Sequence, residues 1–105
     1  NSNVRIGGAS MVTGGVRISR DVPPFIVATD NPVRYGGVNE TLLKSAGTTD
    51  KVIGHIANAY RLVFHGQTSV FDAVIQIKEQ VPEGKEVNAI IKFIKGTQLG
   101  IIGKI

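Results

Sequence analysis

Two hydrophobic patterns follow one another along the chain, and the first has a period of six. Residues 4–21 divide into VRIGGA, SMVTGG and VRISRD, with an aliphatic side chain at the same place in each six, at Ile6, Val12 and Ile18. Such a repeat is typical of a hexapeptide parallel β-helix, in which three sixes form one triangular coil of about 18 residues with the aliphatic side chains pointing inward. A glycine-rich β-meander that happens to align would give the same pattern. The repeat alone therefore leaves both folds open.

A proline-containing stretch from Asp21 to Asn39 separates the two patterns. The adjacent residues Pro23 and Pro24 donate no backbone hydrogen bond, and they push the residues before them toward extended conformations. Regular structure that precedes them is therefore expected to end there. In the rest of the stretch, residues 25–28 predict a short buried strand. Residues 30–32 predict a turn, and residues 36–37 form a flexible glycine pair.

Beyond Asn39 the apolar residues recur at intervals of three and four, which indicates amphipathic helices. Asn39 is a candidate N-cap for the first helix, and Ser69 with Asp72 three positions later predicts a capping box for the third. We expect Ile101 and Ile102 in the tail to pack back on the body, because exposing each would forgo roughly 1.5 kcal/mol or more. The four expected helices cover residues 39–45, 48 or 49 to about 65, 69–81 and 85–95.

These patterns together predict an α+β chain in which a coil precedes a helical domain. We divide the sequence into a terminal coil at residues 1–24, a joint at residues 25–39 and a C-terminal helical domain at residues 40–105.

Composition and charge exclude several classes of function. The chain has no cysteine, which excludes disulfides, thiolate catalysis and cysteine-ligated zinc. The net charge is +4, but the arginines are scattered and the later lysines alternate with glutamates, so we expect no nucleic-acid stripe. No stretch approaches the roughly 18 apolar residues that a membrane span requires. His55 and His65 lie roughly 15 Å apart on one expected helix, too far for one metal ion, and no catalytic triad or phosphate loop is evident.

Three segments resemble one known family. They are DVPPFIVATDNPVRYGGVN at residues 21–39, AYRLVFHG at residues 59–66 and FIKGTQLGII at residues 93–102. The chain thereby resembles the acyl-[acyl-carrier-protein]:UDP-N-acetylglucosamine O-acyltransferases, which start lipid A synthesis. The resemblance implies the last coil of a left-handed parallel β-helix followed by a C-terminal α-helical domain.

The same resemblance implies an activity. The family transfers a 3-hydroxyacyl chain from acyl carrier protein to the 3-hydroxyl of UDP-N-acetylglucosamine, with one histidine as general base. That histidine lies in an earlier coil, upstream of Asn1, and neither His55 nor His65 matches it. We therefore expect a C-terminal fragment with no catalytic residue, no metal and no cofactor, inactive by itself. The intact family enzyme implied by the resemblance is a cytoplasmic homotrimer with active sites between its subunits.

The resemblance also implies part of a substrate surface. Asn39 matches an asparagine beside the nucleotide, although a plain N-cap would also explain it. The family's glutamate and arginine, for the ribose and phosphates, would stand where this chain has Thr41 and Ser45. Glu40 and Lys44 have the same mutual spacing one residue earlier, and either substitute for that pair or are solvated helix charges.

Two residues of the coil match positions that line and close the acyl-chain groove in the family. They are Met11 and Gly14, and Gly14 would be the position that measures chain length. The alternative for Gly14 is a corner glycine that provides conformational freedom. Near the end of the chain, Leu99 replaces the family's usual arginine, which removes a charged contact.

The carrier protein is strongly acidic, so basic residues near the groove are candidates for docking it. We assign this role to Arg34, Lys51 and Arg61, with Lys44 beside them; alternatively each is a solvated charge. Two other functions stay open from the residues alone. One is another hexapeptide-repeat acyltransferase, and the other is a non-catalytic helical module for binding or oligomerisation.

Overall fold

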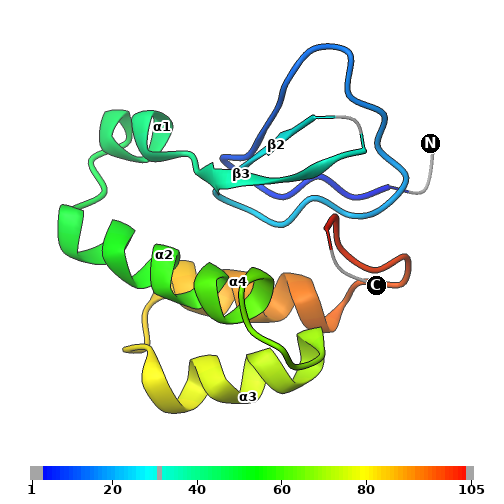
Figure 1. The fold of residues 1–105 in the computed structure, drawn as a ribbon. Helices are drawn as coiled ribbons and strands as arrows, with labels where there is room; N and C mark the ends of the chain where they lie inside the picture. The colour runs from blue at the N-terminus through cyan, green and yellow to red at the C-terminus, as the bar shows by residue number, and fades with distance from the viewer. Residues whose placement is uncertain (1–3, 31, 104–105) are drawn as a thin grey trace.

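The computed structural model describes residues 4–30 and 32–103, and it places an N-terminal coil over a layer of helices (Figure 1). The coil and the joint together form a three-stranded sheet in the order β1-β2-β3, with β1 from the coil and β2 and β3 from the joint. Strand β1 pairs parallel with β2, and β2 pairs antiparallel with β3. The strands are β1 (Met11–Val12), β2 (Ile26–Thr29) and β3 (Arg34–Val38).

The chain before β3 closes one circuit, but the circuit is shorter than the sequence predicts. Parallel pairings join residues 6 and 22, 11 and 27, and 12 and 28, so the chain returns on itself after 16 residues instead of about 18. Between Gly14 and Arg20 the described chain contains a turn and no strand, which shortens that side. The expected inward-pointing aliphatic side chains are also only partly covered: Ile6 is 51% exposed, and Val12 and Ile18 are half-buried.

Strand β3 corrects the expectation of a flexible glycine pair. Gly36 and Gly37 lie inside β3, at an irregularity opposite the β2 segment between Ile26 and Ala28, while Arg34, Tyr35 and Val38 pair with β2. A Cβ atom on Gly36 would lie 2.8 Å from a methyl carbon of Thr29, so the absence of a side chain lets the two strands approach. The expected turn before β3 includes Asn31, which lies outside the described residues.

The four helices confirm the helical half of the prediction. The side chains of Thr49 and Ser69 accept hydrogen bonds from the backbone N–H groups of Val52 and Asp72, at 3.2 and 3.1 Å, and so cap the second and third helices. Asn39 precedes the first helix, but its side chain makes no capping bond. The helices are α1 (Glu40–Ser45), α2 (Asp50–Phe64), α3 (Val70–Gln80) and α4 (Lys85–Lys95).

The core lies between the sheet and the helices α2, α3 and α4. Ile26 of β2 and Ile56 of α2 are fully buried, and Tyr60 is buried while its hydroxyl donates a 2.5 Å hydrogen bond to the Pro24 carbonyl. Ile101 and Ile102 are buried as well, which confirms that the tail packs back on the body. The coarse α+β prediction is therefore confirmed; where the domain boundaries lie stays a prediction.

A buried carboxylate ties the coil to the tail. Asp21 accepts hydrogen bonds from the Arg5 backbone N–H at 2.9 Å and from the Thr97 hydroxyl at 2.6 Å. Its own backbone pairs with Gly100 and Ile102 at 2.8 and 3.0 Å. Hydrogen bonds to an ionic acceptor are stronger than hydrogen bonds between neutral groups. Asp21 therefore holds the start of the described chain, at Arg5, to its end, at Thr97.

Candidate functional site

An open groove runs between the coil and α1, and it brings together five of the residues named from the sequence. Its volume is about 650 Å³. Met11 from β1 forms part of one side, and Asn39, Glu40, Thr41 and Ser45 come from the start and the body of α1. The lining set is Ser10, Met11, Val27, Val38, Asn39, Glu40, Thr41, Leu42 and Ser45.

Asn39 is held between the coil and α1. Its side-chain amide donates a 3.2 Å hydrogen bond to the carbonyl of Ala9, and its backbone N–H donates a 2.7 Å bond to the carbonyl of Phe25. Its own carbonyl accepts the first bond of α1, from Leu43 at 3.2 Å. Asn39 is therefore positioned by three contacts and is not a side-chain N-cap.

The polar side of the groove comes from α1. Ser45 donates a 3.0 Å hydrogen bond to the Thr41 carbonyl one turn earlier. Glu40 lines the groove at the start of the helix, whereas Lys44, one turn further on, is exposed and does not line it. The structure thus brings Glu40 to the site and leaves Lys44 beside it.

The other side of the groove is apolar. Met11, Val27 and Val38 line the groove from the sheet, and Leu42 adds an apolar side chain from α1; Met11 is 48% exposed and Leu42 is 45% exposed. Exposure of these apolar side chains to water is unfavourable. A ligand that covered them would remove this apolar surface from water. Leu42 was not predicted at this site. Its position in the sequence, one residue after Thr41 on α1, could have indicated it.

Gly14 does not line the groove in this chain. It lies exposed in the turn that follows β1, and a Cβ atom built on it meets no other atom within 4 Å. The neighbouring Gly15 is the one with a positive φ, at 81°, so the turn depends on Gly15 for its backbone conformation. A corner role that needs positive φ is therefore wrong for Gly14.

The basic candidates lie outside the groove. Arg34 forms an ion pair with Asp30, four residues earlier on the same hairpin. Lys51 and Arg61 are exposed on α2. Leu99, where the family's arginine would stand, borders a separate hollow formed with Arg5, Asp21, Gly96 and Gln98.

The two histidines make no catalytic arrangement among the described residues. His55 is half-buried on α2, and His65 follows that helix with its ring 6.2 Å from the ring of Tyr35. No group of three or more His, Cys, Asp or Glu residues within 4–30 and 32–103 could hold a metal ion. In the same described part of the chain, no helix is both long and apolar enough to cross a membrane.

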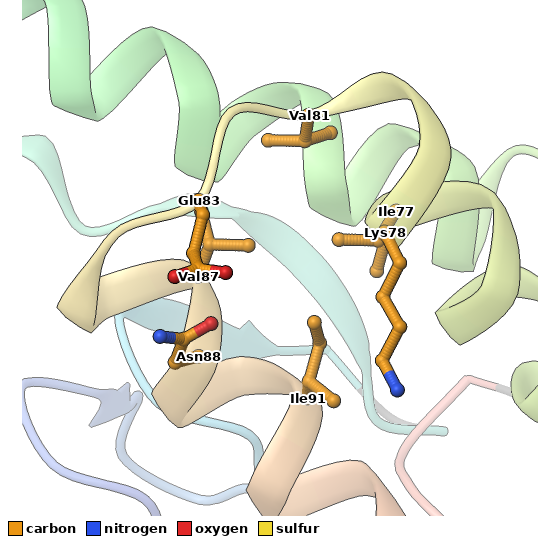
Figure 2. Close-up of a pocket in the computed structure, with 7 residues that line it drawn as sticks. All are labelled: Ile77, Lys78, Val81, Glu83, Val87, Asn88 and Ile91. Atoms are coloured by element: carbon orange, nitrogen blue, oxygen red, sulfur yellow. The ribbon is translucent and has the colours of Figure 1, made fainter.

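A second hollow lies between α3 and α4 but gathers none of the predicted site residues. Figure 2 shows buried aliphatic side chains, including Ile77 and Val87, around it, with Lys78, Glu83 and Asn88 at its border. Hydrogen bonding and charge from Lys78 lower the pKa of the nearby Lys95. We find no arrangement there for catalysis, so the groove at α1 is the candidate site.

Comparison with known proteins decides the family. The model for domain 2 of UDP-N-acetylglucosamine O-acyltransferase matches residues 21–102, which is most of the chain. The chain belongs to this family. Among curated relatives, the acyl-[acyl-carrier-protein]–UDP-N-acetylglucosamine O-acyltransferase of Paraburkholderia phymatum is 34% identical over 103 residues, covering 94% of this chain and 39% of the relative. The corresponding enzyme of an Anaeromyxobacter species is 31% identical over 97 residues, covering 92% and 38%.

Solved structures of O-acyltransferases have the same fold. The UDP-N-acetylglucosamine acyltransferase of Bacteroides fragilis superposes with a TM-score of 0.95 at 35% identity, over 97% of this chain and 40% of that one. The Acinetobacter baumannii enzyme gives 0.90 at 28% identity, over 95% and 39%. The chain thus spans about two-fifths of the length of the O-acyltransferases it matches. The resemblance inferred from the three sequence segments is confirmed.

Proposed function

We propose that this chain is the C-terminal part of an enzyme that transfers a 3-hydroxyacyl group from acyl carrier protein to the 3-hydroxyl of UDP-N-acetylglucosamine. In that enzyme it supplies the last coil of a left-handed parallel β-helix and the helical domain. The observation that supports this best is the groove, because Asn39 and Met11 reach it from two elements in a chain of this family. The enzyme would act as a cytoplasmic homotrimer, with each active site between subunits.

The chain would bind substrate without performing the chemistry. Acyl transfer to a hydroxyl needs a general base within hydrogen-bond reach of the proton it removes. Neither His55 nor His65 lines the groove in the described structure. In the proposed enzyme, the base would be a histidine in a coil outside these 105 residues.

An activity assay of the chain alone tests whether the chain lacks the general base. We expect no transfer from 3-hydroxyacyl carrier protein to UDP-N-acetylglucosamine, and no difference between the chain and its His55→Ala and His65→Ala variants. Turnover by the unmodified chain that either substitution abolished would overturn the proposal.

In the intact enzyme, the acyl chain would lie in a separate groove between subunits, beside Met11 and ending near Gly14, and not in the groove at α1, which Gly14 does not line. In an enzyme that contains this chain, Gly14→Met should shorten the preferred acyl chain by several carbons, because the new side chain fills the end of the space. The space around Gly14 accommodates a side chain without a local clash, so the variant should fold. An unchanged chain-length preference, measured by competition between carrier-bound acyl chains, would remove Gly14 from this role.

The acidic carrier protein would dock on Arg34, Lys44, Lys51 and Arg61. All four are exposed. Exposed charge pairs contribute less than about 1 kcal/mol each, so removing one charge should raise the KM for carrier protein only a few-fold. Reversing both helix charges with Lys51→Glu and Arg61→Glu should weaken docking much more, and added salt should shrink the difference.

A matched control separates docking from net charge. Lys85→Glu with Lys92→Glu changes the total charge equally, but places it on α4. If the α2 double variant in an enzyme containing this chain binds carrier protein as tightly as the α4 double variant at low salt, docking occurs elsewhere.

A further inference from the structure

The hollow between α3 and α4 has an apolar lining and contains none of the residues assigned to acyl transfer. Its volume is about 290 Å³. The aliphatic side chains that line it are each at most 9% exposed and are Ile77, Val81, Val87 and Ile91. A methylene group is about as large as a water molecule, whose share of the liquid is about 30 Å³, so the hollow has room for a chain of roughly eight carbons. The size and the lining suit a short apolar chain.

The polar border of this hollow is divided by charge. Figure 2 shows Lys78 on one side of the hollow and Glu83 with Asn88 on the other. Lys95 follows Ile91 by one turn on the same face of α4. Its ammonium group lies within hydrogen-bonding reach of the Lys78 ammonium group. One side of the hollow therefore has two cations, and the other has a carboxylate.

The close approach of the two lysines itself indicates an anion. As a hydrogen-bond partner and as a like charge, Lys78 lowers the pKa of Lys95. Each lysine lies in the last turn of its helix, where one cation is favourable, but this does not explain why the two ammonium groups meet. Within residues 4–30 and 32–103, no carboxylate forms an ion pair with either lysine. An anion between them would replace their repulsion with two attractions.

We propose that this hollow binds a small amphiphilic anion, with its anionic head between Lys78 and Lys95 and its apolar chain along Val87 and Ile91. The charge of Glu83 fixes the direction of the ligand, because an anionic head on that side would meet a like charge. Covering the chain removes its apolar surface from water. The hollow shares no lining residue with the groove at α1, so the inference goes beyond the proposed function and does not depend on it.

Titration of the 105-residue chain with carboxylates of increasing length tests the apolar part. Octanoate is the main probe, and the backbone amide NMR signals of Val81, Val87 and Ile91 are followed. We expect octanoate to shift these signals, and acetate, which has the head without the chain, to leave them unchanged at the same concentration. The affinity should rise about twofold per carbon from butanoate to octanoate, less than the roughly fourfold for full burial of a methylene group, because the hollow is open on one side.

Ligands with the same chain and different heads test the charge. Octylamine should bind at least about fivefold more weakly than octanoate, because its ammonium group meets two like charges. Octyl phosphate should also bind more tightly than octylamine. The tighter of the two anions identifies the head that the lysine pair prefers.

A double substitution tests the lysine pair. Lys78→Gln with Lys95→Gln changes two exposed positions, so the chain should fold, and octanoate should bind about tenfold more weakly at low salt. Most of the preference for octanoate over octylamine should be lost as well. Lys44→Gln with Lys51→Gln is the matched control, because it removes the same charge at exposed positions of α1 and α2. The control should change octanoate binding by less than about twofold.

Three outcomes would overturn the proposal. The first is the absence of octanoate shifts at the amides of Val81, Val87 and Ile91. The second is octylamine binding as tight as octanoate binding in the unmodified chain. The third is an equal loss of octanoate affinity in the control variant and in the variant without Lys78 and Lys95, which would assign the effect to net charge alone.

Discussion

The coil and the helical layer of this molecule are stabilised in different ways. In the coil, backbone bonds such as Gly7 N–H to Val22 at 2.7 Å join distant parts of the chain, while Ile6 and Met11 stay about half exposed. In the helical layer, side chains such as Ile56 and Ile77 are fully buried against one another. The non-glycine residues with positive φ that the structure describes, Ala9, Phe25 and Asp30, all lie on the coil side.

This difference separates stability from ligand binding. The helical layer supplies most of the buried hydrophobic residues, although Phe71 and Ile75 of α3 are 58% and 57% exposed, and burial of apolar surface is the main favourable contribution to folding. The coil keeps apolar side chains and an open groove on its surface, where a ligand can be held. We therefore expect substitutions in the helices to change stability most, and substitutions at the groove to change binding most.

The largest effect should come from the helical core. Ile56→Ala removes a fully buried side chain and should lower the free energy of unfolding by about 2–5 kcal/mol. Ile6→Ala is the matched change in the coil and should cost less than about 0.5 kcal/mol, since Ile6 is half exposed. Urea denaturation measures both, and equal costs would remove the contrast between the two regions.

The link between coil and tail should come next. Asp21→Ala leaves the Arg5 N–H and the Thr97 hydroxyl without their acceptor and should cost about 2–3 kcal/mol. Asp21→Asn retains one acceptor oxygen and should cost less. The link would be unimportant if thermal unfolding showed the alanine variant to be as stable as the unmodified chain.

High pH should weaken the contact between the sheet and α2. Burial, with a further contribution from Tyr35, raises the pKa of Tyr60 well above its ordinary value of 10.0. As the pH rises, the unfolded chain therefore loses the Tyr60 hydroxyl proton before the folded chain does. The contribution of Tyr60 to the free energy of unfolding is fully present below about pH 10 and should decline above it, by up to about 1.4 kcal/mol per pH unit. Tyr60→Phe should flatten that decline in denaturation experiments, and an unchanged decline would contradict the burial argument.

The smallest effect should be at the helix caps. Ser69→Ala removes the acceptor for the Asp72 N–H and should cost about 1 kcal/mol, as should Thr49→Ala on α2. Ser19→Ala, at an exposed position outside the helices, is the control. If the caps act only locally, both cap variants should bind UDP-N-acetylglucosamine as the unmodified chain does. Loss of that binding would show that the two regions are coupled.

Local patterns predicted the helices, whereas the coil depends on distant partners. The bounds of α4 follow from its apolar period, and the Ser69 cap follows from three neighbouring positions. Strand β3 was missed because Gly36 and Gly37 have low strand propensity, and the strand is defined by the pairing of the residues on either side of them, Arg34, Tyr35 and Val38, with β2. The role of Asp21 was missed because its partner Thr97 lies 76 residues away in the sequence.

The residues of the candidate site could be predicted in part, whereas their hydrogen bonds, which depend on distant partners, could not. The resemblance placed Asn39 and Met11 at a substrate surface, and the structure brings them to one groove. It could not show that an amide N–H of Asn39 and the hydroxyl of Ser45 are already bonded, because those bonds depend on the position of Ala9 and on the turn of α1.

Acyl transfer by a chimera tests the central claim most directly. In the chimera, this chain replaces the matching C-terminal two-fifths of the Bacteroides fragilis acyltransferase, whose structure superposes on it with a TM-score of 0.95. We predict that the chimera transfers a 3-hydroxyacyl group from carrier protein to UDP-N-acetylglucosamine, while the chain alone does not. A folded chimera with no transfer, or transfer by the chain alone, would contradict the account.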